Sequence, residues 1–302
     1  MVYTRGGERS NFTVLAQSGK DYMDIEVKPS GQACGASVTG VDLTKELSSG
    51  QIAQIREAWL EHKVLSFSEQ AMSDDDLERF TLYFGCFGDD PYIAPIDGRK
   101  HIIAVQRRAK ETTKLFAENW HTDWSFQKNP PAGTCLFGIT IPPMGGDTLF
   151  ANQEKAWHDM PGKMRTKYRD LIAIHSAKRA YAPKGTYGKQ DQAVDRSMDI
   201  LVSKGAELTQ THPLILAHPE TAKEAIYSCL GYIIGFQGKS DEEASLLLSD
   251  LLMWQGREEF VYTHEWRPKM LVMWDNRSVL HKATGGYEGF DRLLHRTTIS
   301  SL

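Results

Sequence analysis

The sequence predicts a mainly β protein with flanking helices, and three observations carry this expectation. Between about residues 101 and 151, short apolar runs alternate with proline- and glycine-bearing turns, which is typical of strands joined by turns rather than of βαβ units. Amphipathic segments that begin with a serine flank this region. The 302 residues contain no internal repeat and no low-complexity linker, so a single domain, 1–302, is expected.

The amino-terminal third predicts an arm followed by three strands. Residues 1–20 are polar and unpatterned, which predicts a loose arm. The runs at 23–29 and 36–43 predict two short strands, because Pro29 and Gly31 punctuate the chain between them. A third strand is expected at 64–67.

Helices are expected where a serine precedes a periodic apolar pattern. Ser48 precedes Ile52, Ile55 and Trp59, and Ser73 precedes three acidic residues that favour the positive end of a helix dipole. Ser240 with Glu243 forms a capping box. These patterns predict helices at 48–62, from Ser73 and from Ser240, and a further helix is expected at about 153–170.

Further strands are expected from the middle of the chain to its end. They fall at 101–105, 119–126, 134–140, 147–151, 212–219, 225–230, 270–274, 278–281 and 292–299. Residues 180–200 have no clear period, and so long an irregular stretch predicts a lid over an active site.

Composition excludes several classes of partner. The formal net charge is −4, which gives no global electrostatic reason to bind nucleic acid or an anionic membrane. The four cysteines occur singly, without the spacing of a zinc site or a disulfide framework. No apolar run approaches the roughly 20 residues of a membrane span, and no signal peptide is evident. A cytoplasmic protein is therefore expected.

The segment N-W-H-T-D-W-S-F (119–126) places a histidine and an aspartate two residues apart. If this segment is a strand, His121 and Asp123 point to the same face. An imidazole and a carboxylate on one face supply two of the three ligands of the 2-His-1-carboxylate triad that binds non-haem Fe(II). The spacing alone is weak evidence, since a hydrogen-bonded structural pair has the same pattern.

The nine remaining histidines are all candidates for a third ligand. His281 stands out because it ends the strand-like run S-V-L-H and precedes R-L-L-H-R. In that last strand Arg292 and Arg296 share a face. Two buried arginines side by side need anions, which could be internal acidic side chains or a bound dicarboxylate and an anionic substrate.

Several motifs together resemble the taurine/2,4-dichlorophenoxyacetate dioxygenase family of Fe(II)- and 2-oxoglutarate-dependent oxygenases. They run in family order from about residue 25 to the end and are W-H-T-D-W-S-F, P-A-G-T-C-L-F-G, G-G-D-T-L-F, H-P-L-I-L-A-H-P, W-D-N-R-S-V-L-H and R-L-L-H-R-T-T-I. The resemblance implies a double-stranded β-helix, a cupin-like jelly roll with iron at one mouth.

The resemblance also implies roles for individual residues. His121, Asp123 and His281 would bind Fe(II), Thr148 and Arg292 would bind the distal carboxylate of 2-oxoglutarate, and Arg296 would bind the acidic group of the substrate. Family chemistry would consume O2, release succinate and CO2, and hydroxylate the substrate through a ferryl intermediate. Because Asp123 is present, hydroxylation rather than halogenation is expected.

The substrate implied is a small anionic organic molecule, carboxylate or sulfonate. An aryloxyalkanoate or alkylsulfonate, cleaved at a C–O or C–S bond after hydroxylation, is the alternative. Asp90 stands near the position of a sulfonate-binding histidine in taurine-oxidising members, which argues against taurine, although it could simply begin a turn before Pro91. Tyr92 and Tyr232, with Tyr181, could line a cavity for a larger acid, or simply pack in the core.

Two other functions would use the same residues. A non-catalytic sensor of iron or 2-oxoglutarate would keep the triad, and a zinc hydrolase would leave Thr148 and Arg292 without a role. Relatives commonly assemble as dimers or tetramers, so a homo-oligomer is expected.

Overall fold

A seven-stranded sheet forms the base of the molecule. The structure is a computed structural model that describes residues 25–188 and 195–301, so the arm expected at 1–20 lies outside the described residues. The strand order is β1-β2-β3-β13-β5-β15-β4, and all neighbours are antiparallel except the parallel pair β2 and β3. The strands are β1 (Glu26–Pro29), β2 (Ala36–Thr39), β3 (Val64–Phe67), β4 (Ile103–Arg107), β5 (Gly133–Thr140), β13 (Leu271–Asp275) and β15 (Arg292–Ile299).

A three-stranded antiparallel sheet packs on one face of this base. It has the order β12-β6-β14 and consists of β6 (Thr148–Asn152), β12 (Val261–His264) and β14 (Val279–Ala283). Phe150 of β6 and Val279 of β14 share a buried cluster with Val272 and Trp274 of β13. Because neighbouring residues of a strand face opposite ways, Met273 of β13 lies in the cluster on the other face.

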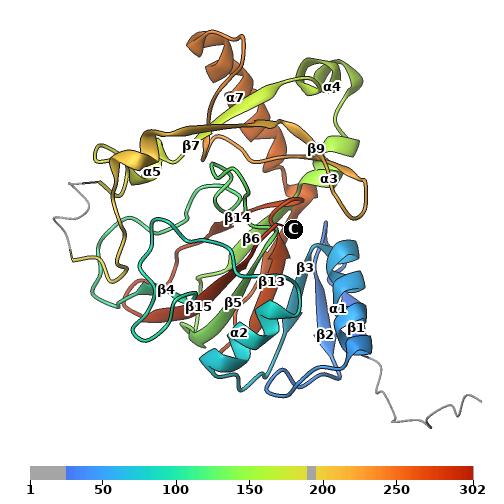
Figure 1. The fold of residues 1–302 in the computed structure, drawn as a ribbon, viewed down its shortest axis with the longest axis vertical. Coiled ribbons are helices and arrows are strands. Elements are labelled where there is room, and N and C mark those ends of the chain that lie inside the picture. The colour runs from blue at the N-terminus through green and yellow to red at the C-terminus, as the bar shows by residue number, and fades with distance from the viewer. Residues whose placement is uncertain (1–24, 189–194, 302) are drawn as a thin grey trace, which may run out of the picture.

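Helices α1 (Ser49–His62) and α2 (Asp74–Leu82) cover that other face. Trp59 of α1 and Phe80 of α2 join Met273 in one core cluster, and Figure 1 shows both helices along the outside of the large sheet. Each begins at the expected serine, since Ser48 and Ser73 both form capping boxes. These two helix predictions are confirmed.

A third group of elements gathers at the top of the view in Figure 1. It contains two small sheets, β11-β7-β8 and β10-β9, and α7 begins behind the expected Ser240 capping box. Its elements are α3 (Gln153–His158), α4 (Gly162–Tyr168), β7 (Ile172–Ser176), α5 (Lys178–Tyr181), η1 (Lys204–Glu207), β8 (Thr209–Pro213), β9 (Ile215–Ala217), β10 (Glu224–Ile226), β11 (Ile233–Phe236), α7 (Asp241–Gln255) and η2 (Glu258–Phe260).

Two sequence expectations are corrected by the structure. The helix expected at about 153–170 is two helices, because Pro161 stands at the cap of α4 and lacks the amide hydrogen that a continuous helix would use. The segment 119–126 is not a strand: His121 forms a single bridge with His281, and residues 123–126 then form a turn. Trp124 adopts a positive φ of 48° in this turn, which interrupts the alternation of an extended strand.

Of the stretch expected to form a lid, 180–200, the structure describes residues 180–188 and 195–200. Its described flanks are packed, since Tyr181, Tyr187 and Met198 are all buried. The lid therefore stays a prediction. Across the described residues, no helix is both long enough and apolar enough to cross a membrane.

Candidate metal centre and adjoining cavities

His121, Asp123 and His281 converge on one point although they come from distant parts of the chain. His121 lies on the connection between β4 and β5, and His281 lies in β14. Two backbone hydrogen bonds join the histidines, His121 N to His281 O (3.0 Å) and His281 N to His121 O (2.7 Å). This single bridge places the two imidazole rings side by side, with centroids 4.2 Å apart.

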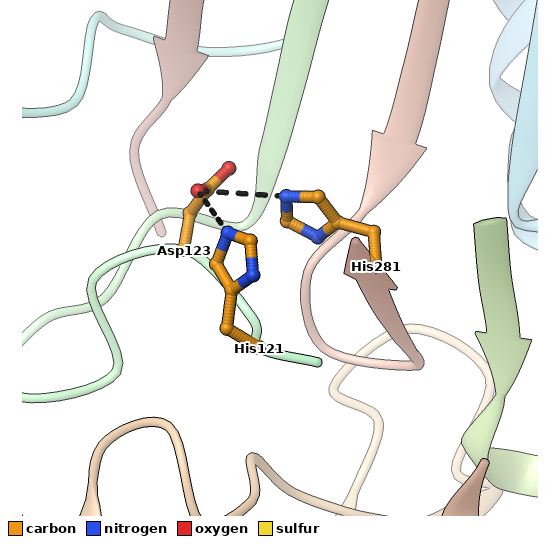
Figure 2. A group of neighbouring side chains, drawn as sticks. All are labelled: His121, Asp123 and His281. Carbon is orange, nitrogen blue, oxygen red and sulfur yellow. Dashed lines mark ion pairs between the residues drawn. The ribbon is translucent and has the colours of Figure 1, made fainter. Parts of the chain in front are cut away.

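The ligating atoms of the three residues lie within 4.8 Å of one another. Asp123 Oδ1 is 3.8 Å from His121 Nε2 and 3.7 Å from His281 Nε2, as Figure 2 shows with dashed lines. These distances exceed those of hydrogen bonds, and the three atoms face a common centre. Two imidazoles and one carboxylate are the donor set of a facial triad, so this group fits an Fe(II) ion.

The protonation states of the three side chains also favour metal binding. Burial lowers the pKa of His281 to about 3 and lowers the pKa of His121, so both rings are neutral near pH 7. Burial works to raise the pKa of Asp123, but the charge of Arg296, helped by a hydrogen bond from Thr134, works against burial, and the pKa is lowered. His121 Nδ1 is bound to the carbonyl of Asn119 (2.9 Å), which leaves Nε2 as the free donor.

Asn276, directly after β13, holds the turn that carries Asp123. Thr122 Oγ1 donates to the Asn276 backbone carbonyl (2.7 Å), and the Asp123 amide approaches Asn276 Oδ1 at 3.4 Å. Trp274 Nε1 donates to the same Oδ1 (3.0 Å). Side-chain groups thus satisfy the buried backbone of this turn in place of a strand neighbour.

A buried hydrogen-bond chain fixes the orientation of the Asp123 carboxylate. Asn276 Nδ2 donates to Thr134 Oγ1 (2.9 Å), and Thr134 Oγ1 donates to Asp123 Oδ2 (2.6 Å). With Oδ2 bound in this way, Oδ1 is left to face the histidines. Sequence reasoning missed Thr134 and Asn276, and the only signal for them was their place in the motifs P-A-G-T and W-D-N-R.

Arg292 and Thr148 line the same cavity as His121 and His281. Arg292 is 6% exposed, and among the described residues it forms no ion pair; its Nη2 donates to Gly146 O (3.1 Å) and its buried Nε has no partner. Burial lowers its pKa, but an arginine stays charged. Trp266 Nε1 donates to Thr148 Oγ1 (2.9 Å), so the threonine proton is free for another acceptor.

Arg296 differs from Arg292 because its charge is already compensated. Its Nη2 pairs with Asp90 Oδ1, and its Nη1 lies 3.5 Å from Asp123 Oδ1. The sequence left open whether internal acids or bound anions meet the two arginines. The structure shows an internal partner for Arg296 and, among the described residues, none for Arg292.

The tyrosines expected near the substrate take two different positions. Tyr232 lies beside His121, with ring centroids 6.4 Å apart, and lines a second cavity of about 390 Å³ together with Tyr181. Tyr92 stacks on Tyr181 at 4.8 Å and lines neither this cavity nor the one at the metal site. His121 borders both cavities, so the second one lies next to the metal site.

Comparisons with a family model, with known sequences and with solved structures all point to the same family of dioxygenases. Residues 26–298 match the family model described as taurine catabolism dioxygenase TauD, TfdA family. The chain is similar to an alkylsulfatase of Acinetobacter baylyi, with 33% identity over 88% of this chain and 82% of the relative. It is also similar to the alpha-ketoglutarate-dependent 2,4-dichlorophenoxyacetate dioxygenase of Cupriavidus pinatubonensis, with 28% identity over 86% and 92%. A crystal structure of a taurine dioxygenase from Burkholderia xenovorans superposes with a TM-score of 0.76 at 30% identity, covering 92% of this chain and 90% of that one.

Proposed function

Because the chain belongs to the TauD/TfdA family of Fe(II)/2-oxoglutarate-dependent dioxygenases, we propose that it hydroxylates a small organic acid and couples this reaction to the conversion of 2-oxoglutarate and O2 into succinate and CO2. The observation that carries the proposal is one cavity bordered by two histidines of the triad, Thr148 and a buried arginine with no ion pair among the described residues. A metal site beside an uncompensated cation suits a cosubstrate that is both a chelator and a carboxylate.

In this proposal His121, Asp123 and His281 hold Fe(II) and leave coordination positions open. Bound Fe(II) and 2-oxoglutarate supply the activation of O2 that an unactivated C–H bond requires. The two neutral imidazoles and the charged Asp123 would give the ion two nitrogen donors and one negative charge. The hydrogen bond from Thr134 keeps one carboxylate oxygen directed at the metal position.

Arg292 and Thr148 bind the distal carboxylate of 2-oxoglutarate. The guanidinium offers a planar pair of donors, and its unpartnered Nε is a buried hydrogen that a carboxylate would satisfy. Thr148 adds a hydroxyl donor without adding charge. A carboxylate there would also compensate the buried charge of Arg292.

The acidic group of the substrate approaches Arg296 and its partner Asp90, and the rest of the substrate lies against Tyr232. Tyr232 borders the cavity directly, and Tyr92 supports Tyr181 from behind. Relatives are described as acting on alkyl sulfates and on 2,4-dichlorophenoxyacetate, which makes a sulfate ester or an aryloxyalkanoate the second candidate class. For such substrates, hydroxylation beside the ether or ester oxygen would lead to C–O cleavage.

The fold also supports this assignment. The seven-stranded and three-stranded sheets pack face to face around one buried cluster, which is consistent with the double-stranded β-helix inferred from the resemblance. The metal position lies where β14 of the small sheet meets the connection between β4 and β5.

The test is succinate formation by the protein loaded with Fe(II), with 2-oxoglutarate and oxygen present, against a panel of alkyl sulfates, sulfonates, carboxylates and aryloxyalkanoates. At least one acid should accelerate succinate release and appear as a hydroxylated or cleaved product. Succinate release that no acid accelerates, together with intact 2-oxoglutarate binding, would count against the hydroxylase and favour a different use of the site.

A further inference from the structure

The ion pair between Asp90 and Arg296 is built into the protein rather than formed at its surface. Their side chains are 9% and 5% exposed. Trp124 Nε1 donates to Asp90 Oδ1 (2.7 Å), and Arg296 Cζ lies 5.1 Å from the centroid of the Trp124 ring. The indole therefore fixes the carboxylate at its edge and covers the guanidinium with its face.

This pair leaves little of Arg296 for another anion. Arg296 Nη2 is bound to Asp90, and its Nη1 lies 3.5 Å from Asp123. Its buried Nε has no hydrogen-bond partner within the described part of the chain. Arg292, four residues earlier on the same face of β15, carries the same charge without an ion pair among the described residues. The two arginines therefore differ sharply in their capacity to attract a carboxylate or a sulfonate.

The surroundings of Arg296 favour apolar groups. Trp124, Tyr92 and Tyr181 form mutual ring contacts, with centroids between 4.8 and 6.4 Å apart. Arg296 itself lines the cavity at the metal site, and the neighbouring cavity of about 390 Å³, which His121 also borders, is lined by Tyr181 with Phe116, Tyr187 and Leu230. This volume falls in the range of small-molecule sites and is mostly apolar.

We propose that Asp90 is a specificity-determining residue that competes with the anionic group of the substrate for Arg296. This inference rests on the proposed function. Asp90 neutralises the guanidinium, so an incoming anion gains little net attraction, and displacing Asp90 would leave a buried carboxylate without its partner. Affinity then comes mainly from apolar surface in the second cavity. The favoured substrates are acids with an alkyl chain or an aromatic ring, and short, strongly charged acids are disfavoured.

The test compares two probes in the wild type and in Asp90→Asn. The probes are ethanesulfonate, which has almost no apolar body, and 2,4-dichlorophenoxyacetate, which has a large one. Their Kd values are read from the change that each causes in the visible absorption of the anaerobic Fe(II) and 2-oxoglutarate complex. The asparagine still accepts the Trp124 hydrogen bond but no longer neutralises Arg296.

Asp90→Asn is expected to tighten ethanesulfonate binding by about tenfold or more and to change the aryloxy acid less than about threefold. The matched control is Asp89→Asn, which changes a neighbouring exposed acid that forms no ion pair within the described residues, and both Kd values should stay as in the wild type. Weaker binding of both probes in Asp90→Asn would show that Asp90 supports Arg296 as an anion anchor and would overturn the proposal, as would unchanged binding of both.

The wild type provides a second measurement that does not depend on the folding of a variant. It should bind the aryloxy acid at least about tenfold more tightly than ethanesulfonate. Equal affinities would overturn the proposal. If the wild type forms no absorption band with Fe(II) and 2-oxoglutarate, the proposed function fails and this inference falls with it. A normal band without the expected change in selectivity contradicts only the role of Asp90.

Discussion

The hydroxyl of Thr134 links Asn276 to the proposed metal ligand Asp123. It is fully buried, accepts a hydrogen bond from Asn276 and donates one to Asp123 Oδ2. Thr134→Val keeps the shape of the side chain but removes this hydroxyl. We expect the Kd for Fe(II), or for Mn(II) as its substitute, to rise about 10- to 100-fold. A metal titration followed by intrinsic fluorescence would measure the change.

Two further variants distinguish a role of Thr134 in orienting Asp123 from a role in the stability of the fold. Thr134→Ser should restore most of the metal affinity, because it returns the hydroxyl. Thr298 is paired with Thr134 across β5 and β15, is also buried, and its hydroxyl has no hydrogen-bond partner in residues 25–188 and 195–301. Thr298→Val should therefore leave the Kd for the metal unchanged. A lower Tm with unchanged metal affinity in Thr134→Val would mean that Thr134 has only a structural role.

Arg292 gives a second prediction at the scale of a residue. Arg292→Lys keeps the positive charge but loses the planar pair of donors, so the KM for 2-oxoglutarate should rise about 10- to 100-fold, as expected for the loss of a charged hydrogen bond. The neighbouring variant His295→Gln is the control, since His295 faces the other way and pairs with Asp74 at 2.7 Å. Similar KM values in wild type and Arg292→Lys would place the carboxylate elsewhere.

At the scale of elements, the sequence predicts a strand or helix well where one local pattern, such as alternation or a serine cap, determines the structure. Strand β15 is found at the expected 292–299, because its alternating residues and buried arginines leave one possible register. Helices α1 and α2 begin at the expected serine caps. In contrast, the segment 119–126 alternates like a strand and is a turn. Its backbone partners are His281 and side-chain atoms of Asn276, which lie far away in sequence and have no local signal.

A network at the end of β13 ties this strand to α1. Arg277 binds Asp275 and Glu220, and Glu220 also binds Arg56 of α1. Arg277→Gln should lower the free energy of unfolding by about 3 kcal/mol at pH 7, because it removes the guanidinium and leaves the buried Asp275 with His218 and the amide of residue 277. Urea unfolding would measure the loss.

The pH dependence of this loss follows from Asp275. Burial works to raise its pKa, but hydrogen bonds from His218 and Arg277 outweigh burial and lower the pKa in the folded protein. The stabilisation by Arg277 is therefore complete above the ordinary carboxyl pKa of about 4 and disappears as the pH falls through the lowered value. The difference between wild type and Arg277→Gln should shrink below about pH 4. A difference that stays constant on acidification would contradict this coupling.

At the scale of the whole molecule, the sequence predicts the sheets and the main helices but not how the layers meet. The strands β7, β11 and β12 were not expected, since they are short and lie between segments with stronger patterns. The partner of each arginine also depends on tertiary structure. Asp90 and Arg296 are far apart in sequence, and only the folded chain shows that they meet while Arg292 has no ion pair among the described residues.

We propose that His121, Asp123 and His281 together form a centre that binds Fe(II) and 2-oxoglutarate. An anaerobic titration tests it most directly. The wild type should develop a weak, saturable visible absorption band that requires both Fe(II) and 2-oxoglutarate, and His281→Ala should not develop it. A folded wild-type protein that shows no band with both ligands in excess, or a His281→Ala variant that shows the full band, would contradict the claim.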